Sequence, residues 1–313
     1  MKHTFFFAVF ALAAALVLGV AGCDTSDETV TPPTTTIAGP TNFRAYSAGD
    51  SSVGLSWTAS VDESKTEVLN PAYTVRAKDT SGTLVRTQTA VKGISEITVT
   101  GLTGGTIYDF VIRMNVASGA VSNDSLVIRW SPARRRDTEL GAPIQVFETA
   151  SPTFPSGLDI FSNSSNGPVT LSMTGVSNSQ IDVFVFTDPG SSDLLIRSAS
   201  LSTVIPTPRT TFFSTVSRNA ETLNDPQATP PDPATYSTLV VTVPAAAATT
   251  GKIFYGKTQD NNYFRLLVTR SGASLISGTS PDRFITVKVS YQGEAGNPYA
   301  MRNGGWILTG EAE

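Results

Sequence analysis

The sequence is poor in the residues that most often carry enzyme chemistry. It contains one cysteine and one histidine, Cys23 and His3, and both lie at its N-terminal end. The rest of the chain therefore excludes Ser-His-Asp and Cys-His catalysis, zinc sites built on histidine or cysteine, and haem ligation by either residue. It also excludes disulfide bonds, so the fold must be stabilised by burial. We expect no cofactor.

Charged residues are also scarce, at 15% of the chain with a net charge of −4, against about 25% in ordinary domains. No basic stripe runs along the sequence, so we expect no nucleic-acid partner. The one basic run, residues 134–136, is interpreted as a solvated linker, with contact to an anionic envelope surface as the alternative. Helical periodicity is missing beyond one or two turns, which predicts an all-β fold class.

The N-terminal residues have the order of a secretory signal. Lys2 precedes an apolar run, Phe5 to Val20, which ends in the small residues Ala21 and Gly22. This order is typical of a signal peptide, and the run is short for a membrane span. The Val-Ala-Gly-Cys sequence ending at Cys23 resembles the lipobox of bacterial lipoproteins. The alternative is an ordinary signal peptide with a stray cysteine.

The resemblance to a lipobox implies a modification and a location. It implies that residues 1–22 are removed, that Cys23 carries a diacylglycerol thioether, and that the new amino terminus is acylated, for example with palmitate. Two or more acyl chains anchor a protein stably, whereas one binds only marginally. The implied location is the bacterial cell envelope, at the outer membrane or the cell surface, with the membrane as partner through the lipid anchor.

Residues 23–40 are predicted to form a flexible tether. They are rich in threonine, proline and acidic residues and show no hydrophobic period. Extended, they would reach roughly 50 Å. The acidic residues Asp24, Asp27 and Glu28 resemble signals that route some lipoproteins to the outer surface. In other bacteria an aspartate directly after the cysteine resembles an inner-membrane retention signal, so the choice of membrane stays open.

Residues 41–132 read as seven short strands separated by turns, which predicts a β-sandwich. Most of these strands alternate apolar and polar residues, as in "SVGLSWT" and "AYTVRAKD". With its tryptophan on the second strand, the segment resembles a fibronectin type III domain. The residues that carry the resemblance are Trp57, Tyr73, Leu102 and Tyr108.

The turn before Tyr108 departs from the family pattern at one position. The family has Leu-x-Pro-Gly-Thr-x-Tyr, and here Gly104 replaces the proline. The resemblance implies a tyrosine corner, in which the Tyr108 hydroxyl bonds back to the backbone. It also implies a spacer or adhesive role without a particular ligand, and the chain lacks an Arg-Gly-Asp sequence in the loop after the sixth strand.

Residues 133–141 are predicted to be a linker, and residues 142–313 a second antiparallel β-sandwich or barrel of unknown family. The segment "GKIFYGKTQDNNYFRLLVTR" predicts a hairpin with its turn at "QDNN", and "FITVKVSYQ" is the cleanest strand. The long connection at residues 202–235 is predicted to be a loop packed over the sheet by Phe212 and Phe213, although "TTFFSTVS" is also compatible with a strand.

Glycan binding is the first candidate for a site in this second domain. It would use exposed aromatic rings, and Tyr291, Tyr299 and Trp306 cluster near the C-terminus. The alternative is that Trp306 packs against the core of the last strand. The sequence therefore leaves open whether these rings contact a ligand or the protein interior.

Two further candidates rest on carboxylates. Asp188, Asp193 and Asp260 could supply oxygen ligands for calcium, but they match no complete calcium loop, and turn chemistry is the alternative. A glycoside hydrolase would need two acids about 5–10 Å apart. The sequence offers three acids without any pattern that pairs them: Asp159, Asp182 and Glu294.

Together these features predict a non-enzymatic cell-envelope lipoprotein with a binding or structural role. A tether and a fibronectin type III domain would present the distal β-domain to a surface partner, a protein or a glycan. The alternatives are a carbohydrate-binding surface protein, or a hydrolase that uses carboxylates or a Ser-Lys pair.

Overall fold

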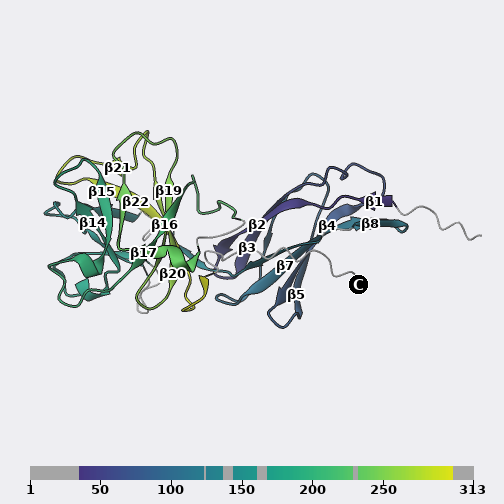
Figure 1. Ribbon diagram of the computed structural model, residues 1–313, viewed down its shortest axis with the longest axis horizontal. Coiled ribbons are helices and arrows are strands. Elements are labelled where there is room, and N and C mark those ends of the chain that lie inside the picture. Colours follow the sequence, from purple (N-terminus) through teal and green to yellow (C-terminus); the bar gives the residue numbers. More distant parts are fainter. Residues whose placement is uncertain (1–34, 123–124, 137–143, 161–167, 228–231, 299–313) are drawn as a thin grey trace, which may run out of the picture. The chain divides into compact units, whose positions relative to one another are not determined.

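The computed structural model of the protein describes residues 35–122, 125–136, 144–160, 168–227 and 232–298 (Figure 1). These residues belong to one compact unit, Thr34–Glu313. They form β-strands and three single-turn 3-10 helices, which confirms the all-β fold class. No helix among them is long and apolar enough to span a membrane. The predicted signal peptide, Cys23 and most of the predicted tether lie outside the described residues.

The N-terminal part of the described chain is a sandwich of two antiparallel sheets. One sheet has the order β2 (Thr41–Gly49), β3 (Ser52–Thr58), β6 (Glu96–Val99). The other has the order β5 (Leu84–Ala90), β4 (Val68–Asp79), β7 (Tyr108–Val116), β9 (Leu126–Trp130). A short parallel pair joins β1 (Thr35–Ile37) to β8 (Ala120–Ser122). All seven strands predicted for this segment are present.

Alternation along the strands builds the core of this first sandwich. Val53, Leu55 and Trp57 are buried on one face of β3, and Tyr108 and Phe110 continue the same core from β7. A strand residue and its second neighbour point to the same face, so the period of two places these side chains between the sheets. The apolar pattern therefore determines which face of each strand is inside.

A glycine in β3 is needed because an aromatic ring covers it. Tyr46 of β2 pairs directly with Gly54, and a Cβ at position 54 would lie 2.0 Å from the Tyr46 ring. The same arrangement recurs in the second domain, where Phe264 pairs with Gly256 and a Cβ would again lie 2.0 Å from the ring. In both sheets a cross-strand ring takes the place of a side chain.

The second domain is also a sandwich of two sheets. The larger sheet has the strand order β10 (Arg134–Arg136), β22 (Phe284–Tyr291), β20 (Tyr263–Thr269), β19 (Lys252–Lys257), β16 (Phe212–Asn219), β17 (Tyr236–Thr238). Two further strands, β11 (Ile144–Phe147) and β21 (Ile276–Ser277), also pair with β22. The smaller has the order β13 (Val169–Leu171), β12 (Gly157–Asp159), β14 (Val183–Thr187), β15 (Leu194–Ser198), β18 (Val240–Val243). One apolar cluster draws residues from both sheets, so a sandwich, not a barrel, forms.

The larger sheet is buried on both faces. Phe264, Leu266 and Val268 of β20 face the core shared with the smaller sheet. The opposite face carries Tyr263 and Leu267, which pack in a separate cluster. The predicted hairpin is confirmed, because β19 and β20 pair antiparallel on either side of the "QDNN" turn. Central strands with two buried faces read as continuous apolar runs, and "YFRLLVT" is such a run with one exception, its arginine.

Two segments differ from the sequence-based expectation. The loop predicted over residues 202–235 contains β16, which pairs with β19 and β17, so the predicted loop is wrong over Phe212–Asn219, where a strand was the alternative. The pairing shifts register after Phe213, and this irregularity breaks the alternation that would have identified the strand. The basic run Arg134–Arg136, predicted as linker, forms β10 and pairs with β22.

Candidate functional site

The signature residues of the first domain lie in its core. Trp57 and Tyr73 meet edge to face with ring centroids 5.3 Å apart, and the Tyr73 hydroxyl accepts a hydrogen bond from the Ser60 backbone N–H at 3.1 Å. The Tyr108 hydroxyl accepts one from the Thr103 N–H at 3.0 Å, as the predicted tyrosine corner requires. These residues stabilise the fold and present no side chain to a ligand.

The turn that holds the tyrosine corner also explains Gly104. Leu102 is buried, and its backbone N–H donates to the Ser51 carbonyl at 3.0 Å. A Cβ at position 104 would lie 2.7 Å from the Asp50 carbonyl oxygen. Glycine therefore suits this position because the neighbouring backbone comes too close for a side chain.

The predicted glycan-binding aromatic residues do not form an exposed set among the described residues. Tyr291 is 2% exposed and belongs to the core between the two sheets of the second domain. It shares a face of β22 with Ile285 and Val289, which are also buried. Tyr291 therefore offers no ring to a ligand, which corrects that part of the prediction. Tyr299 and Trp306 lie outside the described residues.

The predicted calcium ligands make local contacts. Asp188 Oδ1 accepts from the Gly190 N–H at 3.1 Å, and Asp193 Oδ1 accepts from the Ala245 N–H at 2.8 Å. Asp260 pairs with Arg209. Within the described part of the chain, no group of three or more acidic, histidine or cysteine side chains is placed to hold a metal ion. These aspartates serve turn and strand geometry.

Two of the three candidate hydrolase acids lie on neighbouring strands. Asp159 ends β12, and Asp182 immediately precedes β14, with which β12 pairs. Both are buried. The carboxylate of Asp182 is fully engaged, since Oδ1 accepts from Arg209 Nε at 2.8 Å and Oδ2 from the Ile160 N–H at 2.9 Å. Glu294 lies in the segment after β22, outside this pair of strands.

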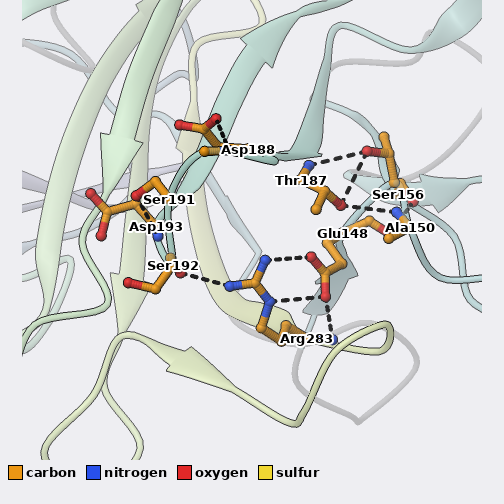
Figure 2. A network of polar contacts seen from close by, with 11 residues as sticks. Glu148, Ala150, Ser156, Thr187, Asp188, Ser191, Ser192, Asp193 and Arg283 are labelled. Carbon is orange, nitrogen blue, oxygen red and sulfur yellow. Dashed lines mark hydrogen bonds and ion pairs between the residues drawn. The ribbon is translucent and has the colours of Figure 1, made fainter.

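A buried ion pair that the sequence analysis did not identify ties the sheets of the second domain together (Figure 2). Arg283 Nε donates to Glu148 Oε1 at 2.9 Å and Nη2 to Oε2 at 2.7 Å. Arg283 also donates from its backbone N–H to Glu148 Oε1 at 3.1 Å. Its Nη1 reaches the Ser192 carbonyl at 2.6 Å, in the loop between β14 and β15. The pair thus links the larger sheet to the smaller one.

Strand register explains why these two residues meet. Phe147 at the end of β11 pairs with Phe284 at the start of β22, so Glu148 and Arg283 come next on each side. The side chain of Glu148 is fully buried, and burial would raise its pKa, but the bonds from Arg283 outweigh burial and lower the pKa below its ordinary value. Such a two-pronged guanidinium–carboxylate contact is among the stronger polar interactions in proteins.

A row of polar side chains crosses the outer face of the larger sheet. Arg135 of β10 pairs with Ser290 of β22, Ser290 pairs with Arg265 of β20, and Arg265 pairs with Tyr255 of β19. Directly opposed residues on antiparallel strands project to the same face, so the four side chains lie side by side. Arg265, Ser290 and Tyr255 are fully buried.

The only sequence signal for this row is a charge inside an apolar run. Arg265 stands between Phe264 and Leu266 in "YFRLLVT", where a central strand would normally have an apolar residue. Arg135 lies in the basic run that the sequence analysis assigned to a solvated linker. Tyr255 and Arg265 face each other across the β19–β20 hairpin. Ser290 and Arg135 join them only through pairings between segments more distant in the sequence.

Comparison with known proteins identifies the first domain. Residues 38–120 match the model of the fibronectin type III domain family, so the chain contains a fibronectin type III domain at this position. The β9 strand that pairs with β7 lies beyond the matched residues and completes the second sheet. A comparison with curated proteins found no match.

Several solved structures resemble part of the chain. Domains d3–d4 of the rat CD45 extracellular region share 15% identity over 42% of this chain and 83% of that one, with a TM-score of 0.27. The FN5 domain of Drosophila Lar shares 20% identity over 32% and 97%, with a TM-score of 0.23. The fn3 domain of human collagen alpha-1(XX) shares 20% identity over 33% and 91%, with a TM-score of 0.26.

Proposed function

We propose that the protein is a non-enzymatic lipoprotein of the bacterial cell envelope, which presents its second β-domain to a surface partner. The observation that carries the proposal is the position of Cys23. The only cysteine ends an apolar run after Ala-Gly and precedes the fibronectin type III domain by a short Thr/Pro tract. A diacylated cysteine in this position would hold the chain at a membrane, because two acyl chains give stable anchoring.

The spacing between the anchor and the first domain suits a display role. The fibronectin type III match begins at residue 38, so the tract after Cys23 would span roughly 50 Å when extended. This segment would separate both β-domains from the lipid headgroups. A spacer domain between the anchor and the distal domain would extend that separation, which is useful where the distal domain contacts a partner outside the membrane.

Incorporation of a palmitate analogue tests the anchor. Cells expressing the full chain are fed alkyne-palmitate, and the purified protein is assayed for label. We expect label on the wild type and on the control variant Ser26→Ala, and loss of label in Cys23→Ser. An unlabelled wild type, or label retained in Cys23→Ser, would contradict the proposal.

The binding role is tested with the soluble chain lacking its first 23 residues. This chain is screened against glycan and envelope-protein arrays, and in parallel against glycoside substrates. We expect saturable binding to an array component and no turnover. Hydrolysis that is lost in Asp182→Asn but kept in the control Asp188→Asn would contradict the non-enzymatic role and would favour a carboxylate hydrolase.

A further inference from the structure

The row formed by Arg135, Ser290, Arg265 and Tyr255 contains a charge without a hydrogen-bonding partner. Arg265 is 0% exposed, and its Nε, Nη1 and Nη2 atoms make no hydrogen bond in the described structure. Burial lowers the pKa of Arg265 to about 10, despite the opposing effects of Tyr255 and Asp225. A guanidinium remains charged at neutral pH even so. Burying a charge without partners is costly, so something should compensate it.

The segment that covers the row does not supply that compensation. Asn224 accepts from Arg135, and Gln227 Nε2 donates to the Tyr255 hydroxyl at 2.6 Å. Asp225 adds one negative charge, but it lies 3.5 Å from Arg218, measured from Oδ2 to Nε. Asp225 therefore pairs with Arg218, and the guanidinium of Arg265 keeps no acceptor within hydrogen-bonding distance among the described residues.

Neighbouring neutral groups are also unsatisfied. In the described structure the Ser290 hydroxyl and the Gln227 Oε1 atom are buried and make no hydrogen bond. The Ser290 hydroxyl lies opposite Arg265 across the β20–β22 pairing and can donate to an acceptor placed between them. Water alone could satisfy these atoms, but water would leave the buried positive charge of Arg265 uncompensated.

We propose that this row holds a buried binding site for one small oxyanion, bound by the Arg265 guanidinium together with the Ser290 hydroxyl. A guanidinium presents parallel N–H groups that match two oxygens of a phosphate, sulfate or carboxylate. Because Arg265 is fully buried, the anion enters only while residues 224–227 are displaced. The bound anion then stabilises the larger sheet, since it binds the folded chain and not the unfolded one.

Thermal unfolding of the soluble chain tests the site. Sulfate, phosphate and acetate are titrated separately at constant ionic strength, set with chloride. We expect a saturable rise in Tm of about 5 °C with the preferred oxyanion, and the ranking tells a tetrahedral oxyanion from a carboxylate. The rise should vanish in Arg265→Met and persist in Arg270→Met, whose guanidinium makes an exposed pair with Glu221. An identical anion response in wild type and Arg265→Met would overturn the proposal.

A second measurement applies if Arg265→Met fails to fold. Wild-type crystals grown with selenate should show an anomalous peak within hydrogen-bonding distance of the Arg265 guanidinium, and Ser290→Ala should weaken the anion-dependent rise in Tm. Ordered water at that position without an anomalous peak, together with an unchanged response in Ser290→Ala, would show that the cluster is only hydrated.

Discussion

Replacing Glu148 by glutamine should strongly destabilise the second domain. The substitution removes the charge that three bonds from Arg283 converge on, at 2.7–3.1 Å, and leaves the guanidinium without its counter-ion in a site where the Arg283 side chain is only 16% exposed. Breaking a buried pair by removing one partner costs about 3–5 kcal/mol. For a domain of this size, that loss corresponds to a fall in Tm of roughly 10 °C.

The assay is differential scanning calorimetry of the soluble chain, following the transition of the second domain. The matched control is Glu221→Gln, because Glu221 forms a pair with Arg270 in which both side chains are largely exposed, and such pairs contribute at most about 1 kcal/mol. The double variant Glu148→Leu/Arg283→Met should lose less than the two single variants combined, since it leaves no buried charge behind. The reasoning is refuted if Glu148→Gln lowers Tm no more than Glu221→Gln.

Three further predictions concern pH and packing. Because the pKa of Glu148 is lowered on folding from 4.5, its contribution is present above that value and lost as the pH falls through the lowered pKa. The Tm difference between wild type and Glu148→Gln should therefore shrink on acidification, and a difference unchanged at low pH would count against the ion pair. Tyr108→Phe should lower the free energy of unfolding by about 0.5–1.5 kcal/mol, measured with urea, because the hydrogen bond from the Thr103 N–H is lost; no measurable loss would show that the corner bond is dispensable. Gly54→Ala should lower the free energy of unfolding by at least about 1–3 kcal/mol, because the new methyl group would overlap the Tyr46 ring. In the control Gly190→Ala, the nearest atom to the new Cβ is 3.7 Å away, so the loss in the same assay should be much smaller. Equal losses of stability in the two variants would contradict the packing argument.

Local patterns were enough to predict the first domain. The seven strands follow from alternation and turn residues, and Tyr108 sits two residues beyond a Gly-Thr turn that resembles the family pattern. Each of these signals lies within about ten residues of sequence. They can therefore be recognised without knowing which strands pair. The tyrosine corner is local too, because its donor is only five residues away.

The second domain shows where local patterns fail. Tyr291 was a candidate ligand residue, although its alternation with Ile285, Val287 and Val289 already placed it on the apolar face. The β16 strand was only the alternative to a loop, and its pairing shifts after Phe213, which weakens the alternation. Glu148 and Arg283 are 135 residues apart, so only the pairing of β11 with β22 brings them together. No local pattern encodes a contact between such distant segments.

The polar row across the larger sheet depends on the same kind of long-range alignment. Arg265 could have been noticed as the one charge in an apolar strand, but its neighbours Ser290 and Tyr255 come from two other strands. Whether a lone buried arginine is a ligand site or an internal ion pair is decided by those neighbours. The sequence alone therefore shows an arginine at an unusual position in an apolar strand. The structure is needed to identify the groups that surround it.

The central claim, that a lipid anchor at Cys23 holds the protein in the envelope, is tested most directly by mass spectrometry of the mature N-terminus. The account predicts an N-terminal peptide that begins at Cys23 and carries the mass of a diacylglycerol thioether and an amide-linked acyl chain. An unmodified peptide that runs through Cys23 from the preceding residues would contradict it.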